Sequence, residues 1–65
     1  MSSRDQDYEL IAVLHDQLEA VETYNRHLKG ATDCEECAKL WTRMKTQAEE
    51  SVSLLRAEIQ RHAVD

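Results

Sequence analysis

The near absence of helix-breaking residues constrains this chain more than any other feature. It contains no proline and one glycine, Gly30, close to its middle. A glycine just past a helix end commonly takes the left-handed conformation that closes the helix. We therefore predict a first helix over about residues 4–29, a turn over 30–32 with Gly30 left-handed, and a second helix over about 33–63. The predicted fold class is all-α: residues 1–65 form a single domain, a two-helix antiparallel hairpin.

Charged residues at the expected helix ends favour this hairpin over one continuous helix. Each expected helix begins with acidic residues and finishes with basic ones, which suits the helix dipole. Thr32-x-x-Glu35 or Asp33-x-x-Glu36 can form a capping box at the start of the second helix. When the chain folds back, the acidic start of each helix lies beside the basic end of the other. The acids are Asp5, Asp7, Glu9, Asp33, Glu35 and Glu36, and the bases are Arg26, His27, Lys29, Arg56, Arg61 and His62.

Apolar residues at heptad spacing predict where the two helices meet. The expected seam consists of Ile11, Leu14, Leu18, Val21, Asn25 and Leu28 on the first helix and of Cys37, Trp41, Met44, Ala48, Val52, Leu55 and Ile59 on the second. A further stripe, the flank, widens each apolar face beyond what one partner helix can cover. The flank contains Leu10, Val13, Gln17, Ala20, Tyr24, Leu40, Gln47, Ser51 and Leu54.

The small size of the chain predicts self-association. A domain of 65 residues has too much surface for its volume to bury a large core, so it needs a covalent cross-link, a metal or a partner chain, and self-association is the default expectation. We expect two hairpins to pair through the flank into a four-helix bundle, a homo-oligomer of at least two chains. The predicted interface residues are Leu10, Val13, Gln17, Tyr24, Leu40, Gln47 and Leu54.

Charge and hydropathy argue against several other partners. The formal net charge is -5 and no cluster of lysine and arginine occurs, whereas nucleic acids and anionic membranes attract basic patches. No apolar run approaches the length of a membrane span, and the first residues, MSSRDQDYEL, lack the apolar core of a signal peptide. We expect a cytoplasmic protein with neither nucleic acid nor membrane as partner.

The run LEAVETYNRHLKGATDCEE, followed by a helix that ends LLRAEIQRH, resembles the encapsulated ferritins. Members of that family have a two-helix subunit and build a four-helix ferroxidase unit from two chains. The resemblance covers most of the segment from Leu18 to His62. It implies a ferritin-like bundle and suggests a protein shell or another helical protein as a further partner.

The ligand positions depart from the family pattern. The family binds iron with a glutamate on the first helix and Glu-x-x-His on the second, and the matching positions here hold Gln17, Gln47 and Glu50. An amide is a poorer iron ligand than a carboxylate. The resemblance therefore implies a degenerate diiron site, and we expect a structural or interaction module with no catalytic residues and no cofactor. The alternative is an iron-binding protein, a ferroxidase or iron store, with a rearranged carboxylate site.

Four residues could supply that rearranged metal site: Glu50, Glu19, Glu22 and His15. Glu19 and Glu22 follow His15 by four and seven residues, which places all three near one surface of the helix. The resemblance implies that acids near these positions attract metal towards the site. A solvated helix edge is the favoured interpretation of this cluster.

The motif CEEC is the remaining chemical signal. Cys34 and Cys37 fall on the first turn of the second helix, where the helix dipole favours thiolates while Glu35 and Glu36 oppose them. A thiol metal site or a redox site is the third functional hypothesis. The favoured interpretation treats Cys37 as a small seam residue and Cys34 as a half-exposed thiol.

Overall fold

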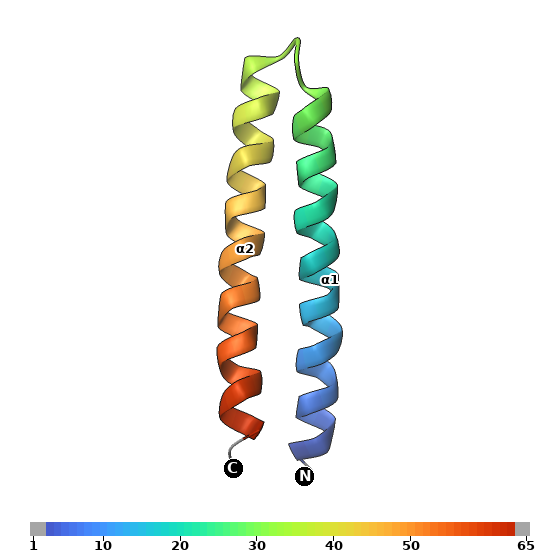
Figure 1. The fold of residues 1–65 in the computed structure, drawn as a ribbon, viewed down its shortest axis with the longest axis vertical. Helices are drawn as coiled ribbons and strands as arrows, with labels where there is room; N and C mark the ends of the chain where they lie inside the picture. Colours follow the sequence, from blue (N-terminus) through green and yellow to red (C-terminus); the bar gives the residue numbers. More distant parts are fainter. Residues whose placement is uncertain (1–2, 64–65) are drawn as a thin grey trace.

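The computed structural model describes residues 3–63, which form two helices and one short connection. Helix α1 covers Ser3–Gly30 and α2 covers Glu35–Ala63. The two helices lie side by side and antiparallel, so that the beginning of α1 and the end of α2 meet at one end of the molecule, opposite the turn (Figure 1). The principal extents are 50 × 14 × 14 Å, which makes the chain a rod two helices wide.

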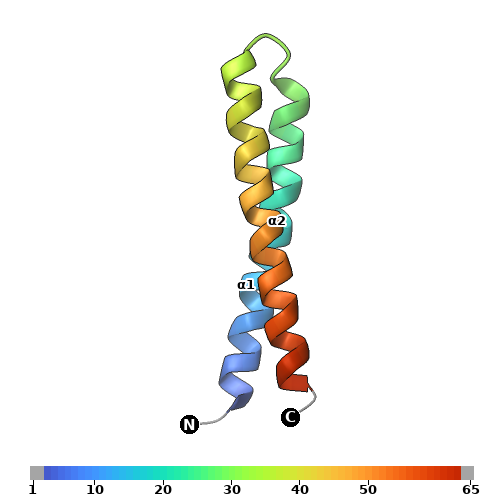
Figure 2. The ribbon, with the colours of Figure 1, turned by 90° about the vertical axis from the view of Figure 1, so that its left-hand side faces the viewer.

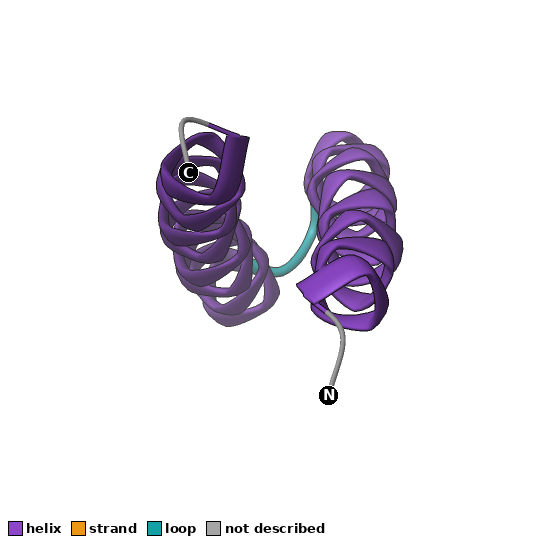
Figure 3. Cartoon of the chain, turned by 90° about the horizontal axis from the view of Figure 1, so that it is seen from below, coloured by secondary structure: helices purple, strands orange, loops and turns teal. Residues whose placement is uncertain are grey.

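The helices cross at a shallow angle along the rod. Seen from the side, α2 passes over α1 near the middle of the molecule (Figure 2). The view along the rod shows the loop that connects the two helices at the far end (Figure 3). This confirms the predicted helical hairpin. No helix among residues 3–63 is long and apolar enough to cross a membrane.

The turn differs from its prediction in two ways. Gly30 is the last residue of α1, and no glycine in the described part of the chain has a positive φ. The Ala31 N–H instead donates to the Leu28 carbonyl at 3.2 Å, a tight final turn that needs no left-handed residue. The second helix begins at Glu35, two residues later than predicted, so residues 31–34 connect the helices.

The start of α2 is capped by sulfur. The Cys37 N–H donates to Cys34 Sγ at 3.0 Å, and the Ala38 N–H donates to the Cys34 carbonyl at 3.0 Å. These two bonds make Cys34 the residue that caps the helix, in the place where serine or aspartate is commonest. Thr32 and Asp33, the predicted caps, do not fill this position, because the helix begins two residues later than predicted.

The contact between the helices is thin. Among the described residues only Ala48 and Val52, both on α2, are buried apolar side chains, and no polar side chain is buried. The remaining contact residues are half-buried. On α1 they include Leu10, Leu14, Gln17, Val21, Tyr24 and Leu28, and on α2 they include Trp41, Leu55 and Ile59.

This contact keeps most of the predicted seam and corrects it at Ile11, Leu18 and Cys37. Ile11 and Leu18 are 56% and 42% exposed, and Cys37 is exposed as well. On α1, Leu10 and Gln17, which also repeat at heptad spacing, are half-buried in place of Ile11 and Leu18, beside Leu14 of the predicted seam. The two stripes overlap on the same helix, so spacing alone does not decide which one faces the neighbouring helix.

Candidate functional site

A continuous groove runs along one side of the hairpin between α1 and α2. It consists of two adjacent hollows of about 290 and 220 Å³, which share Gln17 and Ser51 in their linings. We call this surface the groove. Its lining residues are Val13, Gln17, Ala20 and Tyr24 from α1 and Met44, Gln47, Ala48, Ser51, Leu54, Leu55 and Glu58 from α2.

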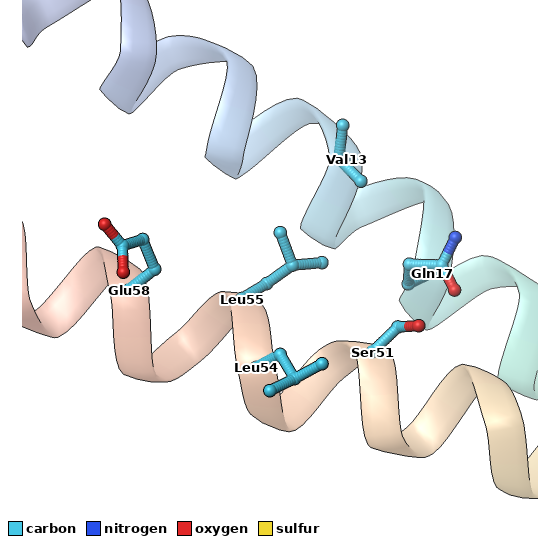
Figure 4. A pocket seen from close by; sticks show the side chains of 6 residues that line it. All are labelled: Val13, Gln17, Ser51, Leu54, Leu55 and Glu58. Atoms are coloured by element: carbon cyan, nitrogen blue, oxygen red, sulfur yellow. The ribbon is translucent and has the colours of Figure 1, made fainter.

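The groove is mainly apolar and open to solvent. Val13 and Leu54 lie on opposite walls of the first hollow (Figure 4), and they are 45% and 73% exposed. Leu40, which is 51% exposed, precedes Met44 by one helical turn and extends the same side of α2. Gln17 and Ser51 place polar groups at the centre. Large side chains in this arrangement lose contact with water only if another surface covers them.

Most of the predicted interface lies on the groove. Its lining includes Val13, Gln17, Tyr24, Gln47 and Leu54. Of the other two predicted residues, Leu10 is half-buried and Leu40 is exposed.

The positions matched to the family's iron ligands are only partly brought together. Gln17 and Gln47 line the same hollow of the groove, whereas Glu50 is exposed and is not part of the lining. Two amides offer neutral oxygens where a diiron centre needs carboxylates to balance its charge. The donor set therefore does not fit a ferritin-like diiron centre.

The surface acids and histidine form a different group from the predicted one. His15, Asp16 and Glu19 each offer a ligand atom, and these atoms lie within 4.8 Å of one another. Asp16 is a member that sequence spacing did not single out, while Glu22 and Glu50 lie outside the group. All three members are exposed on α1. Exposed groups of this kind are common on helices without any ligand role.

The turn carries a disulfide beside an aromatic wall. Cys34 and Cys37 are joined by a disulfide, with Cα atoms 5.2 Å apart. Cys37 is exposed and Cys34 is half-buried, so the interpretation of Cys37 as a buried seam residue is wrong. Both cysteines line a hollow of about 360 Å³, which also contains Arg26, His27, Gly30, Ala31, Asp33 and Trp41.

Trp41 organises this hollow. The His27 ring stacks on Trp41 with centroids 4.8 Å apart, and Tyr24 stacks on Trp41 at 6.0 Å. His27 is exposed, and its stacking on Trp41 was not apparent from the sequence. The stack fixes the last turns of α1 against the beginning of α2, next to the disulfide.

A charged network joins the helices at the opposite end of the rod. His62 lies between two carboxylates, with Nδ1 2.7 Å from Asp7 Oδ1 and Nε2 3.0 Å from Glu58 Oε2. Arg61 also pairs with Glu58. The contact between Asp7 and His62 agrees with the charge pattern, which placed the acidic start of one helix beside the basic end of the other.

The network shifts two pKa values in opposite directions. The hydrogen bond to Asp7 is the largest cause that raises the pKa of His62 above its ordinary value of 6.5; partial desolvation opposes it and Glu58 adds to it. The hydrogen bond from Arg61 is the largest cause that lowers the pKa of Glu58 below 4.5; desolvation opposes it and His62 adds to it. Both shifts favour the charged forms of the pair.

Comparison of the chain with models of protein families, with curated proteins and with solved structures finds no match. The resemblance to the encapsulated ferritins therefore stays a prediction.

Proposed function

We propose that this chain acts through self-association, as a helical hairpin that pairs with a second copy of itself along the groove into a four-helix bundle. In this proposal it is a structural or interaction module. The amides at Gln17 and Gln47 contribute hydrogen bonds at the interface, where the resembling family has iron ligands.

The observation that carries the proposal is the excess surface of the single hairpin. Its accessible surface is 5282 Å². A compact monomer of 7.5 kDa exposes about 4,250 Å² by the usual scaling of area with mass. Each chain therefore leaves roughly 1,000 Å² that a compact protein of this size would bury.

The size of this excess suits a pair of hairpins. Covering it on both chains removes about 2,000 Å² in total, which lies at the upper end of a standard protein interface. Leu54 and Val13 stand on the two walls of the groove and provide apolar anchors for such contact. Gln17 and Ser51 at the centre can hydrogen-bond to their two-fold mates, which satisfies their polar groups when water leaves.

The test is the oligomeric state of the full chain across concentration. We expect sedimentation equilibrium at micromolar concentration to give the mass of at least two chains. Because folding and association are coupled in so small a protein, the thermal midpoint should rise with protein concentration. A fully helical monomer whose thermal midpoint does not change over a hundredfold dilution would contradict the proposal.

A further inference from the structure

We propose that Cys34 and Cys37 form a thiol–disulfide exchange centre that oxidises dithiols, an activity separate from self-association. Its substrate class is a small dithiol or a protein segment with two neighbouring thiols. The inference rests on where the disulfide lies, which sulfur is open to attack, and what receives the sulfur that leaves.

The disulfide contributes little to the stability of the fold. It joins two residues that are three apart in the sequence, at the start of α2, and does not connect the two helices to each other. A cross-link removes less chain entropy as its loop becomes shorter, so this one constrains the unfolded chain weakly. The stack of Trp41 on His27 already fixes the turn without it.

The two sulfurs differ in access. Both cysteines line the hollow, but Cys37 is exposed, whereas Cys34 is half-buried directly before the beginning of α2. An incoming thiolate therefore reaches Cys37 Sγ more readily. The hollow of about 360 Å³ beside it can hold the side chain next to a substrate thiol, against the Trp41 ring.

The position of Cys34 makes it the better leaving group. Its Sγ already accepts the Cys37 N–H at 3.0 Å, and it caps the positive end of the helix dipole. Both features stabilise a thiolate, and a thiol that is more stable as thiolate leaves faster. Charged residues near the disulfide have opposing effects on the stability of this thiolate. The basic residues are Arg26 and Lys39, and the acidic ones are Asp33, Glu35 and Glu36. Lys39 is itself paired with Glu36 at 3.7 Å.

The exchange balances in two steps. A substrate thiolate attacks Cys37 Sγ, the Cys34–Cys37 bond breaks, and Cys34 leaves as a thiolate held by the Cys37 N–H. The second thiol of the substrate, after losing its proton, attacks the substrate sulfur of the mixed disulfide and releases Cys37 as a thiolate. The dithiol is oxidised to a disulfide by two electrons, the two cysteines are reduced by two electrons, and the two substrate protons pass to the cysteines or to solvent.

The first arm of the test measures the rate of reduction. Oxidised full-length protein is mixed with dithiothreitol, and new thiols are trapped and counted with time, for the folded chain and for the same chain unfolded in urea. Because the Cys37 N–H and the helix dipole stabilise the departing Cys34 thiolate, we expect the folded disulfide to react roughly three- to tenfold faster than the unfolded one. Trp41, the only tryptophan, lies in the same hollow and provides an independent fluorescence signal.

The second arm assigns the roles of the two sulfurs with a matched pair of variants. Cys37→Ser leaves only the Cys34 thiol, and Cys34→Ser leaves only the Cys37 thiol while placing a preferred capping residue at position 34. We expect the alkylation rate of Cys34 to reach half its maximum at a pH at least one unit below that of Cys37. A folded disulfide that is reduced no faster than the unfolded one, or equal alkylation midpoints in two folded variants, would overturn the proposal.

Discussion

Leu54 offers the sharpest test of the groove, because its effect on stability differs between a lone hairpin and a pair. In the single chain its side chain is 73% exposed, so replacement by lysine costs a monomer almost nothing. In a pair of hairpins joined through the groove, the same side chain is covered by the partner. Leu54→Lys then removes apolar contact from both copies and brings two charges into the interface.

The size of the effect follows from the exposed fraction. Complete burial of a leucine contributes about 1.5–3 kcal/mol, and Leu54 has 73% of its surface left to bury. The loss is therefore about 1–2 kcal/mol per copy and about 2–4 kcal/mol per dimer. This corresponds to a dimer affinity roughly 30- to 700-fold weaker, since every 1.4 kcal/mol is about a factor of ten. Desolvation of the lysine increases the loss.

Ile11→Lys is the matched control. Ile11 is also an exposed apolar side chain, at 56%, but helical geometry places it about 160° around α1 from Val13, away from the groove. Sedimentation equilibrium gives the dissociation constant of each variant, and circular dichroism follows helix content on dilution. We expect only Leu54→Lys to dissociate and to lose helix at low concentration. An unchanged dissociation constant for Leu54→Lys, or an equal effect of Ile11→Lys, would refute the reasoning.

Two further predictions concern the charged network and the matched ligand positions. Because the folded pKa of His62 is raised, the contribution of His62 to stability is complete below about pH 6.5, its ordinary value, and is lost as pH rises through the folded pKa. In the variant Asp7→Asn the thermal midpoint should therefore fall less steeply as pH rises through that range. If it falls as steeply as in the wild-type chain, the Asp7–His62 contact is not the cause of this pH dependence. The triple variant Gln17→Glu, Gln47→Glu, Glu50→His restores the ligand set of the resembling family, so anaerobic ferrous iron should raise its thermal midpoint and not that of wild type. Equal stabilisation of wild type would favour the iron-binding alternative.

The sequence was sufficient to predict the helical hairpin. One interruption in a chain without proline leaves room for two long helices, and the charges at their ends favour antiparallel packing. The charge pattern also anticipated that Asp7 and His62 lie at the same end, although the enclosure of the imidazole by two carboxylates depends on side-chain geometry.

The heptad spacing of apolar residues could not predict which face of α1 packs against α2. Ile11 and Leu18 repeat as regularly as Leu10 and Gln17, and the two stripes differ by a single residue in phase. The choice between them depends on how each packs against α2, where Ala48 and Val52 are the buried side chains among the described residues. A polar residue, Gln17, therefore faces the neighbouring helix while two larger apolar ones face solvent.

Chemistry at the turn was also only partly predictable. The CEEC motif drew attention to both cysteines, yet residue preferences for helix capping point to Thr32 or Asp33 and give no reason to expect sulfur in that role. Trp41 was expected in the seam, whereas its stacking on His27 depends on side-chain geometry that residue spacing does not give.

The antiparallel hairpin gives the rod chemically different ends about 50 Å apart, with the disulfide at one and the imidazole network at the other. When two rods associate side by side, their relative orientation therefore decides which sites lie together at each end of the pair. In a head-to-tail pair each end of the assembly holds one disulfide and one imidazole network. In a head-to-head pair both disulfides lie at one end of the assembly and both imidazole networks at the other, so that the length of the rod separates the two kinds of site.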